Sequence, residues 1–190
     1  NVARAREVSL TVSAVGAVAR GAVLRRGDAR RGDRILVTGR LGESALARAR
    51  AEREGRRIAR APEARLDAGR RLARQRFRGA CIDLSDGLLA DLGHVCEASG
   101  VGARVDARRV PRPRDLAAAC RRLDLEPDAL VLAGGDDLEL LFTLPPGGPS
   151  TEALGRRLGI PVAEVGEIAA RGLRVAGAAA GLAAPGWRHF

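Results

Sequence analysis

The order of strand-like and helix-like segments predicts a layered α/β or α+β domain. Short apolar runs rich in β-branched residues alternate with segments whose apolar residues recur at helical spacing. Hydrophobic residues make up 46% of the 190 residues, enough to bury a core, and no internal repeat is present. Because the chain has three Phe, one Trp, and no Tyr or Met, this core must consist of Val, Leu, Ile and Ala.

The first third of the chain predicts two strands and then two helices. Residues 8–18 alternate in part and begin Val-Ser-Leu-Thr-Val, which predicts a strand that leads into a Gly-punctuated loop. The apolar run 34–39, closed by Gly, predicts a buried strand. A long helix rich in Ala, Arg and Glu begins near Leu41. A second helix is expected at 63–76, after Pro62, because Pro is tolerated at a helix start.

The rest of the chain continues the alternation. Residues 80–84 predict a strand, and an amphipathic helix follows it and stops at Gly100. The apolar face of this helix consists of Leu88, Leu89, Leu92, Val95 and Cys96. We expect further strands at 101–105, 130–132, 138–144, 163–168 and 173–175, and further helices at 114–123 and 151–158. The run Pro-Pro-Gly-Gly-Pro at 145–149 is the strongest break.

The basic residues are all Arg, and the formal net charge is +10. A nucleic-acid-binding module is one interpretation of this charge. We favour compositional bias, because Arg is spread along the chain among Asp and Glu and few aromatic side chains are available to stack on bases. We therefore expect no nucleic-acid partner.

No apolar run approaches the roughly 20 residues that a membrane span needs. The chain starts without Met and without a signal-peptide pattern, which indicates a soluble fragment of a longer protein with no membrane partner. Cys81, Cys96 and Cys120 are widely spaced among apolar neighbours and include no CxxC pair. We expect reduced, buried thiols in a cytoplasmic protein.

The first acidic motif is Cys-Ile-Asp-Leu-Ser-Asp-Gly at 81–87, where two carboxylates straddle a predicted strand-to-helix turn. Backbone N–H groups at a helix start attract anions such as phosphate, and adjacent carboxylates suit Mg²⁺. We expect Asp83 at the end of the strand, with Ser85 and Asp86 beside it at the helix start. Ordinary helix capping is the alternative, because Ser and Asp are common N-caps, but it does not explain Asp83.

The second acidic motif is Gly-Gly-Asp-Asp-Leu-Glu at 134–139. A Gly pair lets backbone approach a ligand closely, and three acids follow it. A plain hairpin turn between two strands is the alternative interpretation.

The chain ends in an irregular segment that contains Trp187, its only Trp. Trp187 either fills the edge of the core or offers an aromatic face to a ring. His94 and His189 have no partner at a suitable spacing, and we interpret both as structural or surface residues.

In order, segments 82–88, 134–143 and 186–190 resemble the C-terminal landmarks of the thiamine-monophosphate kinase family. Residues 21–26, 32–39 and 41–42 match the middle region of that family, and the resemblance covers essentially the whole chain. The family shares a superfamily with aminoimidazole ribonucleotide synthetase, selenophosphate synthetase and a hydrogenase-maturation protein. The resemblance implies the C-terminal synthetase-like domain at 27–190, a mixed sheet packed with helices. It also implies a remnant of the N-terminal ATP-binding domain at 1–26.

The resemblance also implies an activity, the Mg²⁺-dependent transfer of the ATP γ-phosphate to thiamine monophosphate, which gives thiamine diphosphate. The implied site residues are Asp83 and Asp86 for magnesium, Arg26 and Ser85 for ATP, and Asp136 and Trp187 for the substrate. No covalent intermediate is implied, because the substrate phosphate would attack the γ-phosphorus in line. The N-terminal domain would supply most magnesium ligands and a homodimer interface. Asp136 stands where the family has Glu, and Leu138 where it has Tyr.

Two alternatives are kept. One is another ATP-dependent enzyme of the superfamily, selenophosphate synthetase-like or hydrogenase-maturation-like, against which Trp187 and the 134–143 segment argue. The other is the nucleic-acid-binding module, which explains neither acidic motif.

Overall fold

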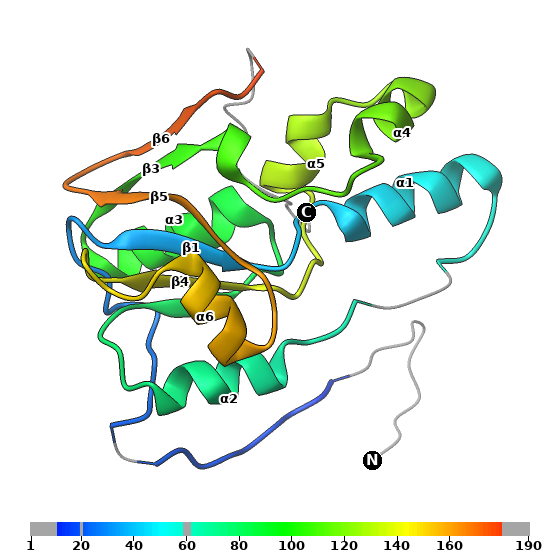
Figure 1. The fold of residues 1–190 in the computed structure, drawn as a ribbon. Helices are drawn as coiled ribbons and strands as arrows, with labels where there is room; N and C mark the ends of the chain where they lie inside the picture. Colours follow the sequence, from blue (N-terminus) through cyan, green and yellow to red (C-terminus); the bar gives the residue numbers. More distant parts are fainter. Residues whose placement is uncertain (1–10, 20, 59–61, 180–190) are drawn as a thin grey trace.

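The computed structural model describes residues 11–19, 21–58 and 62–179 (Figure 1). Within these residues a six-stranded mixed sheet has the order β2-β4-β1-β5-β3-β6. Its strands are β1 Arg34–Thr38, β2 Cys81–Asp83, β3 Gly102–Asp106, β4 Leu140–Leu144, β5 Val162–Ala169 and β6 Leu173–Ala176. Neighbouring strands are antiparallel except for the parallel pair β3 and β6. The predicted mixed sheet is thereby confirmed.

Helices cover both faces of the sheet (Figure 1). They are α1 Glu43–Glu54, α2 Leu66–Arg74, α3 Leu88–Ser99, α4 Leu116–Leu123, α5 Pro127–Ala133 and α6 Thr151–Leu158, with a 3-10 turn at Ala107–Arg109. The larger core cluster joins one face to α1, α3, α4 and α5. The smaller cluster joins the other face to α2 and α6.

The period-two pattern of β1 builds both cores at once. Ile35 and Val37 face the larger cluster, while Leu36 between them faces the smaller one. On the neighbouring strand β4, Leu141 and Phe142 divide in the same way. A strand buried on both faces has a continuous apolar run, here Ile35, Leu36 and Val37.

The strand predicted at 130–132 is wrong. These residues belong to helix α5, whose first turn contains Pro127, and Val131 and Leu132 are buried in the larger core cluster. An apolar run of three residues fits a buried helix as well as a buried strand, so periodicity could not separate the two.

The strand predicted at 8–18 is not formed in its described part. Residues 11–19 have no regular secondary structure, and the rest of that range lies outside the described residues. Val12 is 82% exposed. A strand needs a neighbour to pair its backbone N–H and C=O groups, and no strand of the described residues pairs with this segment.

The remaining elements follow the predictions to within a few residues, and α3 ends before Gly100 as expected. In the described part of the chain, no helix combines the length and apolar character of a membrane span. The three cysteines are free, Cys96 and Cys120 being buried and Cys81 half-buried. Burial raises the pKa of the Cys81 thiol to about 12, so it is not a reactive thiolate at neutral pH.

Candidate functional site

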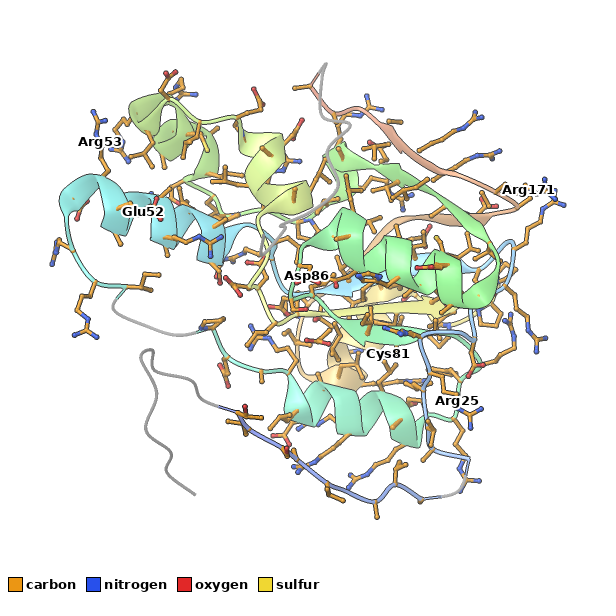
Figure 2. All side chains as sticks on the ribbon, turned by 180° about the vertical axis from the view of Figure 1, so that it is seen from behind. Arg25, Glu52, Arg53, Cys81, Asp86 and Arg171 are labelled. Carbon is orange, nitrogen blue, oxygen red and sulfur yellow. The ribbon has the colours of Figure 1, made fainter. Side chains whose placement is uncertain are left out.

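The turn between β2 and α3 carries the first acidic motif. Asp83 is the last residue of β2 and is exposed, and Ser85 and Asp86 follow half-exposed before α3 begins at Leu88 (Figure 2). The predicted grouping of Asp83, Ser85 and Asp86 at the end of a strand and the start of a helix is therefore confirmed. The side chain of Asp83 makes no hydrogen bond or ion pair with any other residue that the structure describes, so its carboxylate is not used to hold the fold together.

The second acidic motif lies directly against this turn. The backbone N–H of Asp136 donates to the Ser85 carbonyl at 2.7 Å, and that of Leu138 donates to the Leu84 carbonyl at 2.9 Å. Gly135 makes this approach feasible, because a Cβ at that position would lie 2.7 Å from the Ser85 oxygen. The two motifs therefore form one site. The hairpin interpretation of residues 134–139 is wrong, since they connect helix α5 to strand β4.

Asp91 is a site residue that sequence reasoning missed. Its side chain is buried, and its Oδ2 atom accepts hydrogen bonds from the backbone N–H groups of Ser85, Asp86 and Gly87 at 3.0, 3.0 and 3.1 Å. The expectation that these N–H groups attract a phosphate needs correction, because an internal carboxylate already accepts from them. A signal was present: an acid stands among the apolar residues of a helix face.

Carboxylates crowd this turn. Burial, with the nearby charges of Asp86 and Asp83, raises the pKa of Asp91 to about 6, although two backbone hydrogen bonds oppose the shift. A divalent cation would relieve this repulsion, and the exposed oxygens suit a hard ion such as Mg²⁺. The donor set thus fits the metal that the resemblance implies.

His94 lies nearer to these acids than expected. Single ligand atoms of Asp86, Asp91 and His94 lie within 4.8 Å of one another, and the described residues contain no other such group. Asp83, one of the two predicted metal ligands, is outside this group. His94 is exposed, which agrees with its interpretation as a surface residue, but it borders the site.

The three acids of the second motif have different environments. Asp136 is exposed and pairs with Arg48 at 2.6 Å. Asp137 accepts from the backbone N–H groups of Gly42 and Ser44 at the start of α1. Glu139 is buried, with Arg65 and Thr38 as its hydrogen-bond donors. Only Asp136 therefore offers its charge at the surface.

Strained backbone accompanies this segment. Asp136 and Leu138 have φ values of 59° and 51°. Asp tolerates this left-handed region, whereas a Leu there is uncommon, and such conformations concentrate at functional sites.

A hollow of about 610 Å³ opens beside Asp136. Three arginines, Arg40, Arg48 and Arg65, and the acids Asp136, Asp137 and Glu139 are among its lining residues. Its volume is within the range of about 300–1,000 Å³ of small-molecule sites.

Two predicted site residues are not brought into this arrangement. The backbone carbonyl of Arg26 accepts from the Ser99 hydroxyl, at the end of α3 opposite to Asp86. A helix of this length spans about 18 Å, and Figure 2 shows the neighbouring Arg25 well away from Asp86. Trp187 lies outside the described residues.

The family model for the AIR synthase related protein, C-terminal domain, matches residues 30–177. The chain belongs to this family. The matched range contains both acidic motifs and Asp91, and it agrees with the fold that the resemblance implied.

Among known proteins, the thiamine-monophosphate kinase of Salmonella typhimurium is 36% identical over 177 residues, 86% of this chain and 53% of that protein. Among solved structures, the thiamine-monophosphate kinase from Stenotrophomonas maltophilia is 38% identical, with a TM-score of 0.73 over 86% of this chain and 56% of that chain. AaThiL, solved with AMPPCP and TMP, is 28% identical, with a TM-score of 0.69 over 88% of this chain and 54% of that chain. The chain thus spans about half the length of these relatives.

Proposed function

We propose that this chain is the C-terminal half of a thiamine-monophosphate kinase. The observation that carries the proposal is the similarity over 86% of the chain to proteins with that activity. The backbone hydrogen bonds that join the two acidic motifs also support the proposal. They place carboxylates that could bind a metal beside a hollow of substrate size. The proposal includes the division into a remnant at 1–26 and a domain at 27–190.

On the nucleotide side, Asp83 and Asp86 would hold Mg²⁺, and the Ser85 hydroxyl would contact ATP. The metal would offset the negative charge of the phosphates that must approach one another. This chain would contribute by positioning the metal, because its carboxylates lie at a turn whose backbone is held by hydrogen bonds to Asp91 on one side and from Asp136 on the other. Arg26 remains an ATP contact by resemblance alone.

On the acceptor side, Asp136 would contact thiamine monophosphate from the wall of the hollow. Trp187 would offer its ring to the substrate. A homodimer formed through an N-terminal domain, and a cytoplasmic location, stay predictions.

No observation favours another enzyme of the superfamily. The nucleic-acid-binding alternative is weakened because many arginines have carboxylate partners, including Arg34, Arg48, Arg65, Arg78 and Arg112. Paired guanidinium groups have less charge to offer to phosphates.

A chimera tests the proposal. The N-terminal half of the Stenotrophomonas maltophilia enzyme would be joined to this chain in place of its own C-terminal half. We expect the chimera to form thiamine diphosphate from ATP and thiamine monophosphate, and the Asp83→Asn, Asp86→Asn double variant to form none. A chimera that folds and binds ATP but makes no thiamine diphosphate would contradict the proposal.

A further inference from the structure

Asp91 holds the turn that precedes helix α3 from within the helix itself. The N-cap residue of α3 is Gly87, which has no side chain to accept a hydrogen bond. Asp91 instead lies within the first turn of the helix, and its carboxylate reaches back to the 85–87 turn. These bonds differ from the usual N-cap hydrogen bond, which goes to an N–H group inside the first turn; they resemble the bond by which an acid in the first turn reaches back to the N-cap N–H in a capping box.

The packing of α5 explains why a glycine occupies the N-cap. A Cβ at Gly87 would lie 2.9 Å from the backbone carbon of Ala133, the last residue of α5. Gly87 also has a φ of 106°, which L side chains rarely adopt. Because no side chain fits there, an acceptor for the turn must come from another position.

The 85–87 turn is held from two sides. Oδ2 of Asp91 accepts from its three N–H groups, while the Ser85 carbonyl on the opposite side accepts from Asp136. Three bonds to one charged oxygen are stronger than neutral hydrogen bonds and more specific in geometry. The backbone that carries Ser85 and Asp86 therefore has little freedom.

We propose that Asp91 is a positioning residue, whose carboxylate holds the 85–87 backbone so that Ser85 and Asp86 present their side chains to metal and nucleotide. This inference rests on the proposed function, because it needs a ligand at those side chains. Asp91 acts through backbone N–H groups and not as a metal ligand. Pre-organised supporting contacts of this kind govern how accurately a site is formed.

The test uses this chain, with Mn²⁺ alone as the probe. Amide hydrogen exchange of Ser85, Asp86 and Gly87 would be followed by NMR without metal, and Mn²⁺ affinity by paramagnetic broadening of the same resonances. We expect Asp91→Ala to accelerate exchange at the three amides by at least tenfold and to weaken Mn²⁺ binding by at least tenfold. Leu154→Ala is the control, since it opens the core on the other face of the sheet and should alter neither local readout.

Asparagine separates positioning from direct ligation. All three bonds go to a single oxygen, so an amide oxygen can replace it. We expect Asp91→Asn to keep the amides protected and Mn²⁺ affinity within about threefold, whereas Asp86→Asn keeps the amides protected and loses Mn²⁺. If Asp91→Ala does not fold, the comparison of Asp91→Asn with Asp86→Asn is sufficient to separate a positioning role from metal ligation.

Two results would overturn the inference. One is a loss of Mn²⁺ affinity in Asp91→Asn as large as in Asp86→Asn, which would make Asp91 a ligand. The other is unprotected amides in the wild-type chain. If the amides are protected but the isolated chain binds no Mn²⁺, the same titration in the chimera, which supplies the upstream ligands, decides: no Mn²⁺ binding there means that the metal assignment of the proposed function fails and that Asp91 only holds the turn. The amide measurement needs no metal, so the two failures are distinguishable.

Discussion

Asp86, in the turn before helix α3, and Asp91, in the first turn of that helix, have different roles. Asp91 is buried and satisfies backbone donors, whereas Asp86 is half-exposed at the turn itself. Three hydrogen bonds commit Oδ2 of Asp91 to the backbone of the turn, while the half-exposed carboxylate of Asp86 can coordinate a cation. The chemistry of each acid is thus decided by its immediate surroundings and not by residue type.

At the residue scale, we predict that Asp86→Asn lowers turnover of the active chimera by orders of magnitude while leaving the fold intact. Asn and Asp cap helices almost equally well, so a capping role tolerates this change. A magnesium ligand does not, because the neutral amide binds a hard cation weakly. Turnover at limiting Mg²⁺ measures the loss of activity, and circular dichroism checks that the variant is folded. Wild-type activity in this variant would show that Asp86 is not a metal ligand.

At the element scale, helix α1 depends on an acid from the other motif. Asp137 accepts from the N–H groups of Gly42 and Ser44 at 2.7 and 3.2 Å, and α1 carries Arg48, which pairs with Asp136. The Gly42 N-cap has no side chain, so Asp137 takes over the capping. The helix that walls the hollow is therefore placed by the 134–139 segment.

This cap predicts a pH dependence of stability. Burial raises the pKa of Asp137 from its ordinary 3.8 to about 6, so the folded chain binds the proton more tightly than the unfolded one. The contribution of Asp137 to the free energy of unfolding is fully present below the pKa that this carboxyl has in the unfolded chain. It is lost as the pH rises through the pKa of Asp137 in the folded chain. The free energy of unfolding of the wild type, relative to Asp137→Asn, should thus fall by about 1–3 kcal/mol between about pH 4 and pH 7.

Urea unfolding of both proteins across that range, with EDTA present, checks this prediction. Glu52→Gln, an exposed change on the same helix, is the control and should show no such trend. A constant difference between wild type and Asp137→Asn would show that Asp137 does not titrate in this window.

At the scale of the whole molecule, the carboxylate of Asp83 is exposed and has no hydrogen-bond or ion-pair partner among the described residues. The chain spans about half the length of its relatives. The resemblance assigns most magnesium ligands and one wall of the nucleotide site to an upstream domain.

We therefore predict that the 190-residue chain alone forms no measurable thiamine diphosphate. A coupled assay at saturating ATP, Mg²⁺ and thiamine monophosphate measures this, with the chimera as the positive control. Robust product formation by the isolated chain would show that these residues hold a complete site.

Local patterns were sufficient for much of the fold. The strand-to-helix turn at 83–88 was predicted because strand, turn and helix signals are adjacent in the sequence there. Helix α5 was not predicted, because a run of three apolar residues does not distinguish a helix from a strand. Pro127, at the first position of the helix, was the remaining signal of a helix start. The described part of the 8–18 segment lacks the partner strand that its pattern requires.

The sequence by itself determined the mainly aliphatic composition of the core, the order of most elements, the two acidic motifs and the family to which they belong. Only the tertiary structure decided which acids are available to a ligand. Asp91, Asp137 and Glu139 are bonded to groups of the fold itself, whereas Asp83 remains exposed and Asp136 stands at the surface beside a hollow. The physical reason is that burial and hydrogen-bond partners come from segments far apart in the chain, and no local pattern records which backbone N–H groups will face a given carboxylate.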